Sequence, residues 1–351
     1  MGDTVNALSR FEKSVLYVVI VILALIAGCK NKKPAITPEV VKYLDTILDI
    51  TQKTSLFTNN VDWKIIRRNV YKKAGNAQKK EEVFTAVQYM FDQLEDEHGG
   101  LLYKGKLVGR RPKDISGLRK VLVSQIKGKT VKIKTGVFQN KYGYIRIPSM
   151  LTLTKDGTNT YAQELQDSIC KLNVNNMSGW IIDLRLNVGG NMYPMIAGIG
   201  NLIGDGPAGH FTNWDGKVTV SWFIENGEVY LDQRKMTDIK RKCPCKKLPK
   251  IAVLISQVTG SAGESTAIAL KKRANTRFFG EDTYGFVTAN TVHQIDANSM
   301  LLVAECFTAD RDNYIYKTVV SPDTVIVEGD NFQDLSKDVK IIAALKWLSE
   351  N

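Results

Sequence analysis

Residues 250–286 constrain the fold of this chain more than any other stretch. Residues 251–255 form an apolar run whose length predicts one buried strand. A turn of small residues, 259–264, comes next, and residues 267–272 then place apolar side chains on one side of an expected helix. A second short strand is expected at residues 277–280. Strands that alternate with helices predict an α/β core.

Ser261 stands in this turn, just before the expected helix. The first backbone N–H groups of a helix have no partner within the helix, and they favour anions. A serine at this place therefore combines a nucleophilic oxygen with an anion-stabilising site, as acyl transfer requires. The alternative is that Ser261 only caps the helix, because serine is favoured at the N-cap.

A second strand-to-helix turn offers a similar arrangement. The strand pattern of residues 179–186 runs into Asn187-Val188-Gly189-Gly190, and residues 191–203 then predict a helix. Backbone N–H groups of Gly189 or Gly190 could form a further donor site for an anion. The alternative is an ordinary turn in which the glycines supply positive φ angles.

The region before residue 99 is expected to be helical. Thr37-Pro38-Glu39 has the N-cap, early proline and acidic residue of a helix start. A second helix is expected to begin near residue 62, and residues 80–94 carry an apolar stripe typical of a packed bundle. His98 follows that stripe and precedes two glycines, so it is either a C-terminal cap or a candidate base.

The N-terminal residues predict export. Residues 15–28 are an uninterrupted run of 14 apolar or small residues, shorter than the roughly 20 that span a membrane. The run suits the apolar part of a secretion signal. It ends in Ile26-Ala27-Gly28-Cys29, which resembles the lipobox of bacterial lipoproteins, with Cys29 as the lipid attachment site. A plain transmembrane anchor is the alternative.

Charge and cysteine content narrow the function classes. The net charge is +12, but the basic residues are dispersed, and no aromatic-interleaved basic motif indicates nucleic-acid binding. Attraction to an anionic surface or solubility explains this charge more simply. Cys243-Pro244-Cys245 lacks the second ligand pair of a zinc site, so neither metal nor cofactor is expected. Cys170 and Cys306 are expected to be buried free thiols.

Several blocks, taken in order, resemble a known family: serine peptidase family 41, which holds the C-terminal processing proteases, the tricorn core protease and the interphotoreceptor retinoid-binding repeats. The blocks that carry the resemblance are Leu94-Glu95-Asp96-Glu97-His98, Tyr142-Gly143-Tyr144-Ile145-Arg146-Ile147-Pro148, Asp183-Leu184-Arg185-Leu186-Asn187-Val188-Gly189-Gly190, Thr259-Gly260-Ser261-Ala262-Gly263-Glu264, Gly280-Glu281-Asp282-Thr283-Tyr284-Gly285 and Ser321-Pro322-Asp323. The resemblance implies a crotonase-like or ClpP-like α/β core behind a small helical bundle.

The resemblance also implies site residues. One branch of the family uses a lysine as base where this chain has Phe286; the other uses a histidine where this chain has His98. Ser261 would then be the nucleophile and His98 the general base, with Gly189, Gly190 and Ala262 offering N–H groups to the oxyanion. The acid that orients the histidine is open, because Tyr316 occupies the usual place; Glu97, Asp310 and Asp312 are the candidates, and a Ser–His dyad is the alternative.

These inferences give an expected organisation and function. The expected segments are a signal peptide (1–28), a tether (29–36), an N-terminal helical bundle (37–98), a small β-rich cap (99–140) and an α/β peptidase core (141–351). The expected function is an exported peptidase, anchored by lipid in the bacterial cell envelope, that cleaves peptides or proteins, with sites near polypeptide C-termini among the expected targets. A neutral imidazole is needed, so activity should fall below about pH 6. The alternative is a non-catalytic binder of apolar ligands or peptides.

Overall fold

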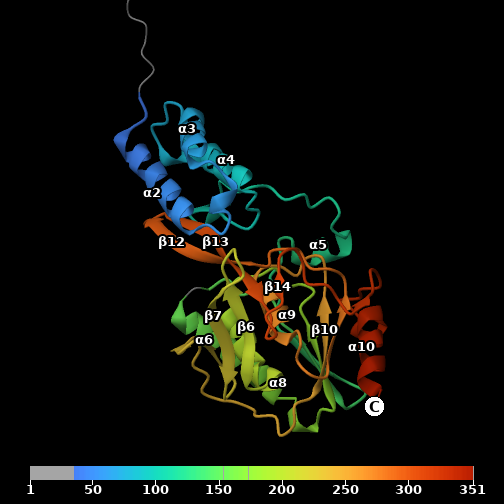
Figure 1. Ribbon diagram of the computed structural model, residues 1–351. Coiled ribbons are helices and arrows are strands. Elements are labelled where there is room, and N and C mark those ends of the chain that lie inside the picture. The colour runs from blue at the N-terminus through green and yellow to red at the C-terminus, as the bar shows by residue number, and fades with distance from the viewer. Residues whose placement is uncertain (1–34, 153, 173, 351) are drawn as a thin grey trace, which may run out of the picture.

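The computed structural model describes residues 35–152, 154–172 and 174–350 of the chain. The signal, Cys29 and most of the tether lie outside these residues. Two sheets and three groups of helices make up the described part (Figure 1). Within it, no helix has both the length and the apolar content to cross a bilayer, and no group of His, Cys, Asp and Glu side chains is arranged to hold a metal ion.

Three helices form a bundle at one end of the molecule, at the top of Figure 1: α2 (Pro38–Thr54), α3 (Trp63–Ala74) and α4 (Phe84–Leu94). Thr37 and Asp62 are the N-cap residues of α2 and α3, because their side chains accept backbone N–H groups at the starts of these helices. For α2 this is the helix start that the sequence predicts. The apolar stripes of these helices meet in one cluster, which also contains Leu301 and Val303 from a distant strand.

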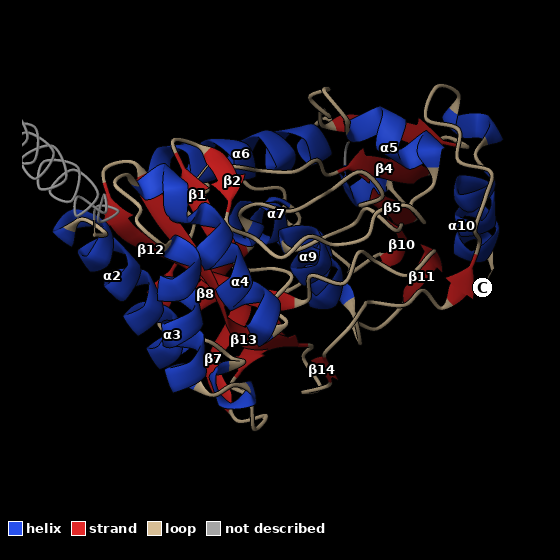
Figure 2. Ribbon diagram, turned by 90° about the horizontal axis from the view of Figure 1, so that it is seen from above, coloured by secondary structure: helices blue, strands red, loops and turns tan. Residues whose placement is uncertain are grey.

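That distant strand belongs to a nine-stranded sheet in which all pairs are antiparallel. The helices lie over the long antiparallel ribbon formed by β12 (Thr288–Asp296) and β13 (Ser299–Ala309) (Figures 1 and 2). The strands are β1 (Gly100–Tyr103), β2 (Lys106–Val108), β6 (Gly206–Thr212), β7 (Val218–Glu225), β8 (Glu228–Leu231), β9 (Arg234–Lys235), β12 (Thr288–Asp296), β13 (Ser299–Ala309) and β14 (Ile315–Tyr316).

The second sheet has six strands in the order β15-β11-β10-β5-β4-β3, parallel except for β3 at its edge. Its interior strands are apolar on both faces, because helices cover both sides. The strands are β3 (Lys134–Phe138), β4 (Tyr142–Arg146), β5 (Gly179–Asp183), β10 (Lys250–Ile255), β11 (Thr276–Gly280) and β15 (Thr324–Val325).

The helices of this second half divide between the two faces. One face packs against α10 (Val339–Ser349), and the other against α6 (Lys155–Cys170), α7 (Met192–Gly198) and α9 (Ala262–Leu270), with α8 (Gly200–Ile203) beside them. The expected α/β class is confirmed. The helix expected from residue 267 begins earlier, at Ala262, because the small residues before it continue the helical path directly from Ser261.

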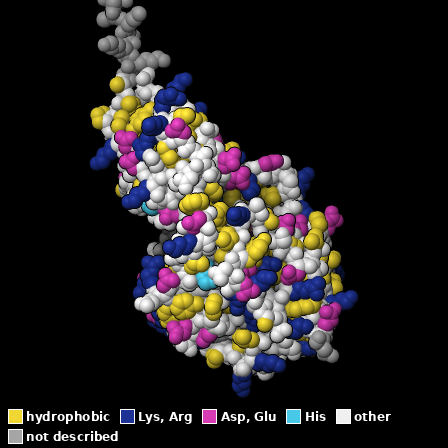
Figure 3. Space-filling model, viewed as in Figure 1, with side chains coloured by type: hydrophobic (Ala, Val, Ile, Leu, Met, Phe, Trp, Pro, Cys, Tyr) yellow, Lys and Arg dark blue, Asp and Glu magenta, His cyan; other side chains and the backbone are white. Residues whose placement is uncertain are grey.

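Residues 99–140 do not form a sheet of their own. β1 and β2 extend the antiparallel sheet, β3 forms the edge of the parallel sheet, and the short helix α5 (Lys120–Ile126) lies between them. This segment therefore joins the two halves of the molecule. On the face shown in Figure 3, basic side chains are scattered among acidic and apolar ones.

One expectation about cysteine is wrong. Cys170, at the end of α6, is not a free thiol but forms a disulfide with Cys243, and the two Cα atoms are 5.6 Å apart. The residues are 73 positions apart in the sequence, so local pattern gave no sign of the pairing. Cys245 and Cys306 are free and partly buried.

Candidate active site

Ser261 occupies a strained backbone position at the start of α9. Its φ angle is +54° and its ψ angle is −120°, a region that residues other than glycine rarely adopt. The strand β10 ends six residues earlier, and its buried apolar side chains fix the turn against the parallel sheet. Ser261 is thus the N-cap residue, as the simpler interpretation held, but its hydroxyl has a further partner.

That partner is the imidazole of His98. The Nε2 atom of His98 lies 2.9 Å from the Oγ atom of Ser261, although the residues are 163 positions apart. The backbone reaches this place through a left-handed residue, Glu95, which ends α4. The carboxylate of Asp96 then accepts the N–H groups of His98 and Gly99, so that the loop is held by hydrogen bonds on the bundle side.

The other ring nitrogen of His98 contacts a residue that the sequence did not suggest. Nδ1 lies 2.8 Å from the Oγ1 atom of Thr288, the first residue of β12. The amide of Asn290, two residues further along that strand, donates to the carbonyl oxygen of His98. β12 therefore holds both the ring and the backbone of His98.

Phe286 stands where the other branch of the family has a lysine, and it packs on the imidazole. The two rings are stacked, with centroids 4.7 Å apart and planes inclined by 17°. Arg110 and Lys113 lie over the Phe286 ring, at 4.9 and 5.0 Å from its centroid. Phe286, which cannot accept a proton, thus covers one face of the His98 ring.

The surroundings of His98 favour its neutral form. Burial, followed by the positive charges of Arg110 and Lys113, lowers the pKa of His98 from 6.5 to about 3. The ring is half-buried at the surface of the molecule. This shift favours a fall in activity at a lower pH than the expected value of about 6, and the pH at which activity falls stays a prediction.

The glycine loop lies against the serine turn. Gly189 has a φ angle of +116°, and a Cβ atom there would lie 2.7 Å from the Cβ atom of Ser261. Gly190 has a φ angle of +120°, and its Cβ atom would lie 1.8 Å from the carbonyl oxygen of Met150. Only glycine lets the two turns approach this closely. The turns are also joined by a hydrogen bond from the N–H of Gly260 to the carbonyl oxygen of Asn187.

The three expected N–H donors differ in availability. The N–H of Gly189 donates to the side-chain oxygen of Asn187 at 3.0 Å. Over the described part of the chain, the N–H groups of Gly190 and Ala262 have no acceptor. A pair of free N–H groups beside a serine hydroxyl can stabilise an anion that forms on a substrate carbonyl oxygen.

None of the three expected orienting acids contacts the imidazole. Glu97 pairs with Lys113 at 3.0 Å, and Asp310 accepts hydrogen bonds from Tyr316 and Tyr314. The carboxylate of Asp312 lies on an exposed turn, whose backbone N–H donates to Asp310. The hydroxyl of Thr288 fills the place expected for an acid.

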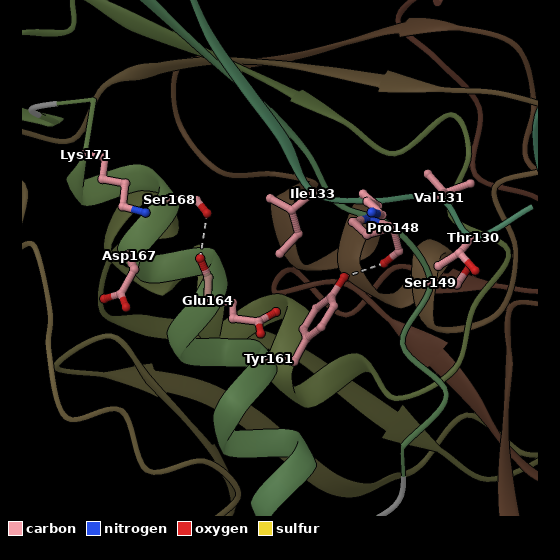
Figure 4. Close-up of a pocket in the computed structure, with 11 residues that line it drawn as sticks. Thr130, Val131, Ile133, Pro148, Ser149, Tyr161, Glu164, Asp167, Ser168 and Lys171 are labelled. Carbon is pink, nitrogen blue, oxygen red and sulfur yellow. Dashed lines mark hydrogen bonds between the residues drawn. The ribbon is translucent and has the colours of Figure 1, made fainter.

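A cavity of about 540 Å³ is lined by neither Ser261 nor His98. Figure 4 shows the residues that line it. It lies between α6 and the segment 130–133, and Pro148 and Ser149 form its wall towards the site. The hydroxyl of Tyr161 donates to the carbonyl oxygen of Pro148, and the Oγ atom of Ser149 accepts the N–H of Val188. The cavity wall is therefore joined directly to the glycine loop.

Comparison with known proteins gives consistent results. The family model "Peptidase family S41" matches residues 141–326. The nisin-resistance protein of Lactococcus lactis subsp. lactis is 31% identical over 301 residues, which cover 84% of this chain and 86% of that protein. The carboxy-terminal processing protease CtpA of Bacillus subtilis (strain 168) is 30% identical over 206 residues, 56% of this chain and 38% of that protein.

Two solved structures share the fold over most of the chain. A lipoprotein from Streptococcus agalactiae superposes with a TM-score of 0.68 at 24% identity, covering 89% of this chain and 97% of that one. The photosystem II D1 C-terminal processing protease superposes with a TM-score of 0.56 at 16% identity, covering 86% and 96% of the two chains.

Together, the fold and these likenesses define a serine-type peptidase. Its substrate is accordingly a peptide or a protein. The chain belongs to peptidase family S41.

Proposed function

We propose that this protein is an exported serine peptidase, anchored in the cell envelope, in which Ser261 is the nucleophile and His98 the general base. The observation that carries the proposal is the 2.9 Å contact between the Nε2 atom of His98 and the Oγ atom of Ser261 at the start of a helix. Phe286 supports the histidine over a lysine as base, because no proton acceptor stands at its position.

The geometry supports a two-step reaction. The Nδ1–H of His98 donates to Thr288, which leaves the Nε2 lone pair directed at the Ser261 hydroxyl. Nε2 takes the hydroxyl proton while Oγ attacks the peptide carbonyl carbon, and it returns the proton to the leaving amine as the C–N bond breaks. In the second step Nε2 takes a proton from water while the water oxygen attacks the acyl carbonyl carbon. It then returns the proton to Oγ of Ser261 as the ester C–O bond breaks and the carboxylic acid leaves.

Two backbone donors stabilise the negative charge in this reaction. The N–H groups of Gly190 and Ala262 hold the oxyanion, while the N–H of Gly189 is engaged with Asn187 and acts by keeping the loop in place. The neutral imidazole that the first step needs is favoured by the lowered pKa of His98.

Labelling with a fluorophosphonate probe tests the pair. The wild-type protein should be labelled, the Ser261→Ala variant should not, and His98→Ala should be labelled about 10²–10⁴ times more slowly, the usual worth of a general base. The chain offers a matched control, because the Nδ1 atom of His210 lies 3.0 Å from the hydroxyl of Ser221. Since that pair lies on adjacent strands without a helix start, Ser221→Ala should leave labelling unchanged.

The outcome that contradicts the proposal is specific. If folded wild-type protein is neither labelled at Ser261 nor able to cleave any peptide in an envelope extract, the catalytic pair is refuted. Peptides that accumulate in cells carrying Ser261→Ala, compared with wild type, would identify the substrates. The names of the relatives suggest two kinds of substrate to examine first, polypeptide C-termini and nisin.

Export and anchoring rest on the N-terminal sequence. Residues 15–28 supply the apolar part of a signal, and Cys29 follows them as the proposed lipid attachment site at the bacterial cell envelope, facing the periplasm or the exterior. The disulfide between Cys170 and Cys243 supports an oxidising compartment. Mass spectrometry of the N-terminal peptide tests the anchor: a lipid on Cys29, absent from Cys29→Ala, is expected, and an uncleaved unmodified N-terminus would favour a transmembrane anchor.

A further inference from the structure

The carboxylate of Glu264 lies behind the proposed catalytic pair, where no solvent reaches it. It belongs to the first turn of α9, three residues after Ser261. Its Oε2 atom accepts two backbone N–H groups, from Ser261 at 2.7 Å and from Phe286 at 2.8 Å. One oxygen atom therefore joins the backbone of the nucleophile to the backbone of the aromatic residue on which His98 is stacked.

The second oxygen of Glu264 strengthens the same connection. Its Oε1 atom accepts the hydroxyl of Thr283 and the N–H of Gly285, the latter at 2.8 Å. Three of the four donors thus come from the loop 283–286, and the fourth is Ser261 itself. A further hydrogen bond joins this loop to the serine turn, because the N–H of Tyr284 donates to the carbonyl oxygen of Thr259.

We infer that Glu264 is a positioning residue for the catalytic step, which fixes the serine turn relative to the Phe286 platform and so sets the distance between Ser261 and His98. The inference rests on the proposed function. It adds a role for a side chain that touches neither the substrate nor the reacting atoms. The physical reason is geometric: rigid placement of reacting groups lowers the barrier, and a displacement of about 1 Å can cost on the order of 10²-fold in rate.

The chemistry of the site requires a carboxylate rather than an amide. All four partners are donors in this arrangement, and an ionised carboxylate offers acceptor sites on both oxygens. A glutamine would turn an NH₂ group towards at least one of the N–H donors, which leaves that donor unpaired in a buried place. Burial raises the pKa of Glu264 to about 7, and the four hydrogen bonds oppose that rise.

The test compares Glu264→Gln with a matched control in the fluorophosphonate assay. Glu228→Gln is the control, because Glu228 is also buried and accepts the hydroxyl of Thr237 and the N–H of Ile239, neither of which belongs to the serine turn or to the loop 283–286. In Glu264→Gln the maximal labelling rate should fall by about 10- to 100-fold. The half-saturating probe concentration should change by less than about twofold, since positioning affects the chemical step more than binding. Glu228→Gln should label at the wild-type rate.

The outcomes separate this inference from the proposed function. If wild-type Ser261 is labelled and folded Glu264→Gln is labelled equally fast, Glu264 has no positioning role, while the catalytic pair stands. A loss that appears only in the half-saturating concentration would also overturn the inference. If the wild-type protein is not labelled at all, the proposed function itself fails.

A second pair of variants covers the case in which Glu264→Gln does not fold. Thr283→Val removes one of the four donors and leaves the carboxylate in place, whereas Thr283→Ser keeps the hydroxyl. Thr283 contacts neither Ser261 nor His98 in the hydrogen bonds of the described chain. The labelling rate should fall by about threefold to tenfold in the valine variant, the worth of one typical hydrogen bond, and return in the serine variant. Equal rates in both variants would refute the inference.

Discussion

The two sheets contribute different halves of the site, and they do so by different means. The parallel sheet carries the serine turn and the glycine loop, each of which directly follows a buried strand. The antiparallel sheet carries the surroundings of His98, through Thr288 and Asn290 on β12. Each turn of the first half is built by residues close in sequence to its own strand, whereas the surroundings of His98 in the second half come from residues that meet only in space.

The antiparallel half depends on packing between the helices and β13. Leu301 and Val303 share the bundle core, the hydroxyl of Tyr43 donates to Ser299, and the N–H of Leu56 donates to the carbonyl oxygen of Ala304. His98 leaves the bundle immediately after α4 and is met there by β12. The parallel half thus carries the proposed nucleophile and the oxyanion donors, and the antiparallel half holds the proposed base and its tautomer.

The largest expected effect tests the parallel half. Gly190→Ala should lower peptidase activity by about 10²–10³-fold, the usual cost of losing one oxyanion donor. The reason is that the new Cβ atom would lie 1.8 Å from the Met150 carbonyl oxygen, so the loop must move. Gly206→Ala is the control, since Gly206 also has a positive φ angle, +122°, but open space around it. Equal activity of the two variants would show that the loop geometry is not needed.

The prediction of intermediate size concerns His98, which the antiparallel half surrounds, and the measured quantity is the free energy of unfolding. Folding lowers the pKa of His98 from its unfolded value of 6.5. At pH values between the folded and the unfolded pKa, the imidazole therefore carries an added proton in the unfolded chain and not in the folded chain. The stability that depends on the neutral ring is complete above pH 6.5 and is lost as the pH falls. Relative to His98→Gln, the wild-type free energy of unfolding should therefore decrease by up to about 1.4 kcal/mol per pH unit below 6.5.

Chemical denaturation at a series of pH values from 8 to 4.5 measures this difference. Subtracting the His98→Gln curve removes the contributions of the other titrating groups, Glu264 among them. Parallel curves for the two proteins would mean that His98 titrates alike in the folded and unfolded chains, and that its surroundings do not favour the neutral form.

The smallest expected effect separates orientation from chemistry. Thr288→Val removes the hydroxyl that contacts Nδ1 of His98 and keeps the shape of the side chain. Activity should fall by up to about tenfold, the worth of one neutral hydrogen bond, with little change in stability. Thr288→Ser, which keeps the hydroxyl, should recover most of the activity. If valine is tolerated without loss, the orientation of the ring does not depend on the Thr288 hydroxyl, and stacking on Phe286 is sufficient.

The sequence by itself determined the parts of this protein that depend on short-range pattern. The apolar run before Ser261, the glycine pair after β5 and the stripe on α4 each follow from period and turn chemistry, and they gave the α/β class and the two turns. The resemblance to the family added His98 as the partner of Ser261, and the structure places the two in contact.

Only the tertiary structure decided which groups complete the site. Thr288 is 190 residues from His98, Cys170 is 73 from Cys243, and the carboxylates expected near the imidazole bond elsewhere. A hydroxyl at the start of a strand carries no local sign of its partner, because that partner is set by how the bundle packs on β12 and β13. In the glycine loop, by contrast, the N–H of Gly189 is engaged by a side chain only two residues away, that of Asn187, while those of Gly190 and Ala262 are free within the described chain.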